Sequence, residues 1–346
     1  MNLSSLSRIF SPGPSEEKQA TLTPEELQSM SNYFDETLLS RLQGLSPASV
    51  SLGWLSPAVD VAAFAYSAAL PLLPDLDLDK ADSLSPWYFV DSMRTLAVCN
   101  CISSEVAQLR HRHVKLRIAI ERLHLDHSPS VEDFHRARNL LADSEGEGSN
   151  EVVKSTDTIE ELIRDLAPSI RKLGPHGRAS PVERAVLHVF RAAVFVMVFV
   201  GGVIAAAFHA SPGAVGGIEV PKEFPWGRAF RTIESAVIAE LGRDQENERR
   251  RSALRELEDL KASLRDLIEM MDEVAASGGN QEVVERTRAL ATKLETANGV
   301  LLEGLERLAQ SVDGLFATVT DVRTKMMEDL RARPMPEVPL NRFFRD

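Results

Sequence analysis

An uninterrupted apolar segment, Ala192 to Phe208, constrains this chain more than any other stretch, because it contains no charged side chain. The residues Ser180-Pro181-Val182-Glu183 precede it with the spacing of a capping box, and the proline stands where a missing N–H costs nothing. Pro212-Gly213 supplies a stop signal. We therefore expect one helix over residues 181–211 that is apolar on every face in its second half.

A helix that is apolar all round belongs either in the core of a helical protein or in a bilayer. The segment spans roughly 25 Å, which is short of a hydrocarbon core of about 30 Å. Two alternatives stay open at this stage. The helix is a buried core element, or it is inserted in a membrane and spans it once.

Composition favours helices throughout the chain. Hydrophobic residues make up 44% of the 346 residues, but aromatic residues only 6%, and a sandwich or barrel would need more aromatic and β-branched side chains. No segment shows the alternating pattern of a strand, so the predicted class is all-α. The net charge of −12 argues against nucleic acid as a partner, since phosphate binding needs a basic surface. We expect the basic runs Arg110–His113 and Arg249–Arg251 to coat exposed helix faces.

The C-terminal part has the regular apolar spacing of a coiled-coil seam, with alternating steps of three and four residues. The first run is Leu257, Leu260, Leu264, Leu267, Met271 and Val274. The second run is Val283, Thr287, Leu290, Leu294, Ala297, Leu301, Leu305, Leu308, Val312, Leu315, Val319, Val322 and Met326. Ser277-Gly278-Gly279-Asn280 separates them, which predicts an antiparallel helical hairpin. The second arm is longer, so its excess length must pack on the N-terminal helices or on a partner.

Four parts follow from these patterns. Residues 1–22 form a disordered leader, residues 23–180 an N-terminal helical bundle, residues 181–211 the central apolar helix, and residues 212–346 the C-terminal hairpin and tail. Within the bundle, start and stop signals predict helices over residues 24–45, 57–70, 85–125, 130–141 and 158–173. The whole is an elongated bundle around the central helix.

Chemistry-bearing patterns are scarce. Cys99 and Cys101 are two residues apart on a predicted helix and cannot bridge to each other, so a reducing compartment is expected. We expect His111, His113, His124 and His127 to be exposed polar positions rather than ligands. The chain lacks GxSxG, GxxxxGK[ST], GxGxxG and HExxH motifs. We assign no catalytic, cofactor-binding or metal-binding residue and expect no enzyme.

Several stretches in order resemble the plant BYPASS/ROH family of helical proteins. They are FDETLLSRL (Phe34–Leu42), SVSLGW (Ser49–Trp54), WYFVDSMRTLAVCNCISSEVAQLR (Trp87–Arg110), FVMVFVGGVIAAAF (Phe195–Phe208) and VPKEFPWGRAF (Val220–Phe230). The resemblance implies a regulatory protein without known enzymatic chemistry. One branch is implicated in restraining a root-derived mobile signal in plant development, and another in binding exocyst subunits during secretion.

Three readings of function follow. In the first, the protein is a non-enzymatic helical scaffold that binds protein partners, exocyst subunits being the candidates that the resemblance implies. In the second, it is a single-pass tether anchored in a membrane through Ala192 to Phe208. In the third, the apolar helix lines a pocket for a lipophilic small molecule. We expect a cytoplasmic or membrane-associated protein.

Overall fold

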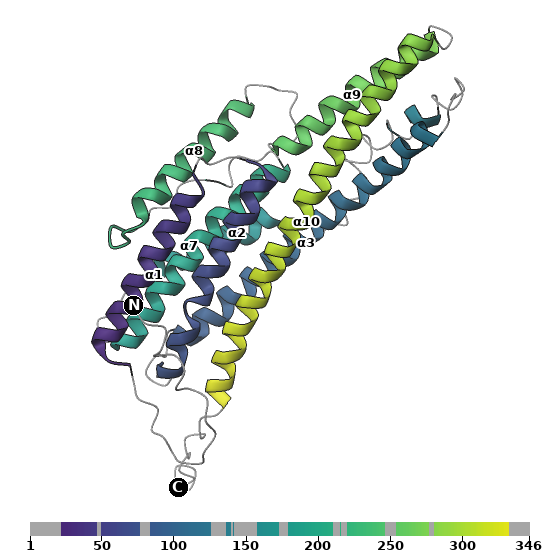
Figure 1. Ribbon diagram of the computed structural model, residues 1–346. Coiled ribbons are helices and arrows are strands. Elements are labelled where there is room, and N and C mark those ends of the chain that lie inside the picture. Colours follow the sequence, from purple (N-terminus) through teal and green to yellow (C-terminus); the bar gives the residue numbers. More distant parts are fainter. Residues whose placement is uncertain are drawn as a thin grey trace, which may run out of the picture.

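The computed structural model describes residues 22–46, 50–76, 84–125, 136–139, 141, 158–172, 179–209, 215, 220–245, 254–276 and 280–331. All regular elements within these ranges are helical, which confirms the predicted all-α class (Figure 1). The predicted leader lies outside the described residues except for Leu22, as does most of the helix predicted over residues 130–141.

The elements in chain order are α1 (Pro24–Gly44), α2 (Leu52–Ser67), the 3-10 helix η2 (Leu70–Asp75), α3 (Leu84–Leu125), α5 (Ile159–Leu166), α6 (Ser169–Lys172), α7 (Pro181–His209), α8 (Gly227–Gln245), α9 (Arg255–Ala276) and α10 (Gln281–Arg331). The long helices run roughly along one direction and give an elongated bundle (Figure 1).

Helix α7 holds the apolar segment and lies at the centre of the bundle. Its first turn forms the expected capping box, in which the Glu183 N–H donates to Ser180 Oγ at 3.1 Å and the Ser180 N–H donates to Glu183 Oε2 at 3.3 Å. Every residue from Ala192 to Ala207 is buried, because α1, α2, α5 and η2 pack around the helix. The other helices thus bury the apolar surface of α7 away from water.

Length and composition alone would let two segments cross a membrane, Leu52–Asp75 and Pro181–His209. Of the most apolar stretch in the second, 94% is buried inside the bundle. Helix α7 has the composition of a membrane span and the packing of a core helix.

Helix α2 starts five residues earlier than the sequence predicts, at Leu52 instead of Pro57, and Pro57 lies inside it. Because Pro57 has no backbone N–H, one intrahelical hydrogen bond is missing there, but the proline does not mark the start of α2. Ser51 is the N-cap residue and makes no side-chain cap. Carboxylates from distant helices accept from the first backbone N–H groups instead, as described below, and this long-range capping was invisible to local start signals.

Helices α9 and α10 form the predicted antiparallel hairpin, and α10 continues past α9 to pack against α2 and α3 (Figure 1). All six predicted seam residues of α9 are buried. In α10 the prediction is wrong at two positions, because Leu290 and Ala297 are only partly buried and their neighbours Ala291 and Asn298 occupy the seam. With Ala291 and Asn298 in the seam, its residues still follow each other in steps of three and four. The sequence pattern favoured Leu290 over Ala291 only because leucine is more apolar.

Glycine 304 allows α10 and α2 to approach closely. A Cβ atom at Gly304 would lie 2.8 Å from Leu52 Cδ1 and 2.9 Å from Leu52 Cβ, which is closer than carbon atoms pack. The contact places the middle of α10 directly on the first turn of α2.

Candidate functional site

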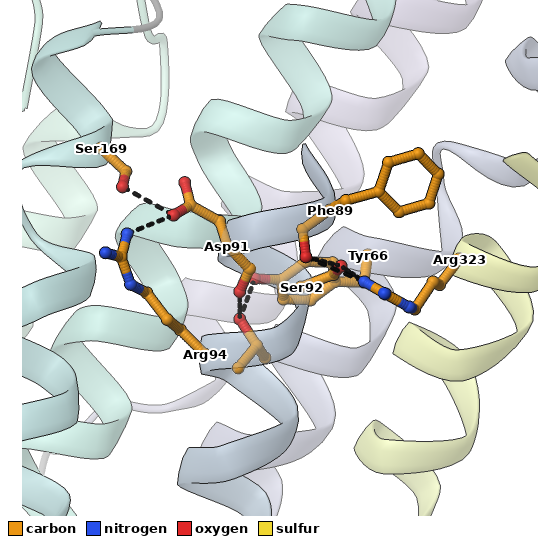
Figure 2. Close-up of polar contacts among 8 residues, drawn as sticks. Tyr66, Phe89, Asp91, Ser92, Arg94, Ser169 and Arg323 are labelled. Carbon is orange, nitrogen blue, oxygen red and sulfur yellow. Dashed lines mark hydrogen bonds and ion pairs between the residues drawn. The ribbon is translucent and has the colours of Figure 1, made fainter. Parts of the chain in front are cut away.

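A buried carboxylate on α3, Asp91, is the centre of a polar network that the described helices enclose (Figure 2). Asp91 is 2% exposed. Its Oδ1 accepts hydrogen bonds from Ser169 Oγ at 2.8 Å and from the Arg94 guanidinium at 3.0 Å. A buried charge requires such compensation, since an isolated carboxylate in an apolar interior is strongly unfavourable. The site therefore ties α6 to α3.

Tyr66 extends this network to α2. Its hydroxyl lies 2.9 Å from Thr95 Oγ1, which in turn donates to the Asp91 carbonyl oxygen at 3.0 Å. With the Thr95 proton used in this way, the Tyr66 hydroxyl acts as the donor to Thr95. Burial raises the pKa of Tyr66 above its ordinary value. The phenol therefore stays protonated at neutral pH and serves as a structural donor.

Arg323 connects the C-terminal half of α10 to the same region of α3 (Figure 2). One guanidinium nitrogen donates to the Phe89 carbonyl oxygen at 2.8 Å and to Ser92 Oγ at 2.9 Å. The guanidinium carbon lies 5.1 Å from the centre of the Phe89 ring, within the range of a cation–π contact. These contacts fix the register of α10 on α3.

A second polar site joins α1, α7 and the segment before α8. Asp35 on α1 accepts from the Trp226 indole N–H at 3.2 Å, and His188 Nε2 lies 2.9 and 3.1 Å from its two carboxylate oxygens. The imidazole packs against Phe34 and Phe224, with ring centres 6.0 and 4.9 Å away. Asp35 therefore holds both the His188 imidazole of α7 and the segment at Trp226 next to α1.

A third polar site lies at the first turn of α2. The Val50 N–H donates to Glu240 Oε2 at 3.0 Å and the Leu52 N–H donates to Glu256 Oε1 at 2.9 Å. The Arg255 N–H donates back to the Val50 carbonyl oxygen at 3.2 Å. Carboxylates at a helix N-terminus also interact favourably with the helix dipole. This turn thereby joins α2 to α8 and α9.

A buried polar pair also joins α3 to α10. Asn298 is 1% exposed, and its amide donates to the His113 carbonyl oxygen at 3.1 Å. The prediction that His113 is exposed is therefore wrong, because its ring lies on the side of α3 that faces α10. Burial, together with the nearby charge of Arg112, lowers the pKa of His113 to about 4. His111, two residues earlier, is exposed as expected.

An open groove of about 430 Å³ runs between α2 and α10. It is lined by Gly53, Ser56, Pro57, Asp60, Arg307, Gln310 and Ser311. Arg307 is paired with Glu303 at 2.7 Å. Ligand pockets are enclosed and mostly apolar, and this groove is neither. Helix α7 does not line it, so the groove is not the lipophilic pocket considered from the sequence.

Cysteine and acidic residues show no ligand arrangement in the part of the chain that the structure describes. No group of three or more His, Cys, Asp or Glu residues there is placed to hold a metal ion. Cys99 is buried, Cys101 is partly buried, and neither forms a disulfide, as their spacing predicted. Sequence reasoning missed Asp35, Asp91 and Asn298, because a single polar residue within a helical pattern carries no signal of its burial.

Large apolar side chains remain exposed on several of the described helices. Helix α10 exposes Val300, Phe316 and Leu330. Helix α3 exposes Val90, Met93, Val114 and Ile118. Tyr33 on α1 and Ile238 on α8 complete the set among the described residues.

The fold and its polar sites define a class of protein, an all-helical bundle in which the buried polar groups hold helices together. Comparison with known proteins adds a family resemblance. A family model described as "Protein ROH1-like" matches residues 172–330. These residues include α7, α8, α9 and nearly all of α10.

Curated relatives come from plants. "Protein BPS1, chloroplastic" of Arabidopsis thaliana is 23% identical over 309 residues, covering 87% of this chain and 83% of that protein. "UPF0496 protein 4" of Oryza sativa subsp. japonica is 28% identical over 253 residues, covering 70% of this chain and 54% of that protein. The chain thus spans about half the length of the rice relative. No solved structure matches the chain.

These matches confirm the resemblance to the BYPASS/ROH proteins drawn from the sequence.

Proposed function

We propose that the protein is a non-enzymatic regulatory scaffold that acts by binding other proteins. The outer surface of α10 carries this proposal. Phe316 and Leu330 are 36% and 37% exposed, although both border the buried seam. Both also lie within the residues that the ROH1-like family model matches. Aromatic side chains next to a hydrophobic strip are the usual anchors of protein interfaces.

The family resemblance suggests two roles, and we propose both for this chain. The first is exocyst-linked secretion, in which α10 binds an exocyst subunit. The second is developmental signalling, in which the protein restrains a root-derived mobile signal through a protein partner.

Binding of the full chain to purified exocyst subunits by biolayer interferometry tests the first role. We expect one subunit to bind the parent and Phe316→Asp to weaken that binding about tenfold or more. Tyr33→Ser is the matched control, because Tyr33 is 69% exposed but lies outside residues 172–330. Equal binding by the parent and by Phe316→Asp, or binding by no subunit, contradicts the role.

A second candidate function is a membrane-anchored tether, and the composition and length of α7 favour it. Insertion would require the bundle to open, since α7 is covered by its neighbours. Carbonate extraction of fractionated plant membranes, with chloroplasts separated, distinguishes the two. A spanning protein stays in the pellet, whereas a scaffold held by protein contacts is released.

A further inference from the structure

The distal half of α3 forms one edge of a helical arm. Helix α3 runs beside α10, and α10 also contacts α9 (Figure 1). Asn298 of α10 donates to the His113 carbonyl oxygen at 3.1 Å, and Arg110 pairs with Glu306 at 2.7 Å. These contacts fix which side of α3 faces α10 and which side faces outward.

The outward side carries an apolar strip. Val114 and Ile118 are one helical turn apart and are 46% and 49% exposed. Val106, His113 and Leu116, on the opposite side, are buried. A helix that buries one apolar side and exposes a second one has a surface beyond what its own fold uses. We call Val114 and Ile118, with the arginines beside them, the α3 edge.

The part of α3 that carries this edge is basic, although the whole protein is acidic. Residues 106–125 hold five Lys or Arg residues against one acid, whereas the whole chain has a net charge of −12. Residues 255–276 of α9, on the other side of α10, hold seven acids against three bases. The arm therefore has a basic edge and an acidic edge, which orients it in the field of a charged surface.

The basic groups that flank the strip are available for new partners. Arg110 and Arg117 pair with Glu306 and Glu121 at 2.7 and 3.0 Å, but all four side chains are about half exposed. Exposed pairs of this kind contribute little stability and exchange readily. Each arginine can therefore turn to a phosphate without a large loss.

We propose that the α3 edge docks on the surface of an anionic lipid bilayer, a role that does not depend on the protein contacts proposed above. Val114 and Ile118 enter the headgroup region, and Arg110 and Arg117 contact lipid phosphates. Basic residues beside branched aliphatic ones are typical of interfacial helices. An edge of this composition suits a membrane better than an acidic protein, since protein anchors are mainly aromatic and sit in pockets.

Flotation of the full chain with lipid vesicles tests this docking. We expect the parent to float with phosphatidylcholine vesicles that contain about a third phosphatidylserine, and not with phosphatidylcholine alone. Binding should fall steeply with added salt. The double variant Val114→Asp/Ile118→Asp should reduce the floated fraction about tenfold, and Arg117→Glu several-fold.

Two matched controls accompany these variants. Val300→Asp places one such charge at an apolar residue of α10 that is 52% exposed, and Arg231→Glu reverses an exposed charge on α8. Both should float like the parent, and circular dichroism verifies that every variant keeps its helix content. The proposal is overturned if the parent fails to float, which is the result expected of a surface that binds acidic proteins and not lipid. It is equally overturned if vesicle binding resists high salt or if the double variant still binds. Both results are expected if α7 inserts into the bilayer.

Discussion

The backbone N–H of Leu52 donates a hydrogen bond of 2.9 Å to Glu256 Oε1, across 204 residues of sequence. Leu52 begins α2 and Glu256 lies in the first turn of α9. The same leucine contacts Gly304 on α10. One residue near the N-terminal end of the bundle is thus held by two helices from the C-terminal half.

Replacement of Glu256 by alanine should lower the free energy of unfolding by about 1–2 kcal/mol, because the first N–H group of α2 loses its acceptor. Urea denaturation followed by circular dichroism measures the change. Glu273→Ala, an exposed residue of the same helix, should change stability by less than about 0.5 kcal/mol. Similar losses in both variants would contradict long-range capping of α2.

Gly304→Ala should destabilise the protein by about 1–3 kcal/mol, since the new methyl group overlaps Leu52. Gly314→Ala on the same helix has the opposite expectation. No atom lies within 4 Å of a Cβ atom at Gly314, so the higher helix propensity of alanine should stabilise by about 0.5–1 kcal/mol. Thermal unfolding of both variants shows whether each raises or lowers the unfolding temperature. Stabilisation by Gly304→Ala would show that α10 and α2 pack less closely than described here.

His113 should make stability depend on pH. Its folded-state pKa of about 4 lies below the ordinary value of 6.5, so between these values the unfolded chain binds the proton more readily. The free energy of unfolding therefore falls as the pH drops from about 6.5 to about 4, and His113 contributes about 3 kcal/mol to that fall.

The variant His113→Leu isolates this contribution. Its stability profile over the same pH range should be flatter than that of the parent, whatever its absolute stability. His111→Gln, at an exposed histidine two residues away, should run parallel to the parent. A profile for His113→Leu that also runs parallel would mean that the imidazole is accessible to water.

Cys99 should be protected from thiol reagents in the folded protein, because burial raises the pKa of its thiol to about 12 and only the thiolate reacts. The Cys101→Ser variant retains Cys99 as its single thiol. It should show almost no reaction with Ellman's reagent until urea unfolds it. Fast labelling in the absence of urea would place Cys99 at an accessible position.

Val198→Asp should prevent folding or solubility, because Val198 is 3% exposed in the middle of α7 and an unpaired buried charge costs several kcal/mol. The soluble fraction and the helix content after expression are the measurements. Val300→Asp provides the same change at an exposed site. A soluble, helical Val198→Asp variant would show that the bundle does not enclose α7.

Local rules predicted the helices well where the deciding groups are close in sequence. The capping box at Ser180 is present as expected, and another opens α1 at Thr23. In each, the cap and its partner are three residues apart. The seam of α9 follows directly from apolar spacing. Such features depend on one turn of helix or on one repeating interval, and both are visible in a single sequence.

The errors occur where a distant part of the chain decides. Helix α2 begins before Pro57 because Glu240 and Glu256 accept from the N–H groups ahead of it. Asn298 takes a seam position because α3 offers it the His113 carbonyl oxygen. Asp91 is buried because Ser169 and Arg94 compensate it. None of these partners is within the reach of a helical repeat.

The long-range capping of α2 has a consequence for synthesis of the chain. Translation proceeds at about 5–20 residues per second, so α2 and the apolar helix α7 leave the ribosome several seconds or more before α10 is complete. During that interval the nascent protein lacks the helix that closes over α2 and α3. The apolar sides that α2 and α3 turn toward α10 are then open to chaperones, whereas the helices that cover α7, namely α1, α2, η2 and α5, precede it in the chain.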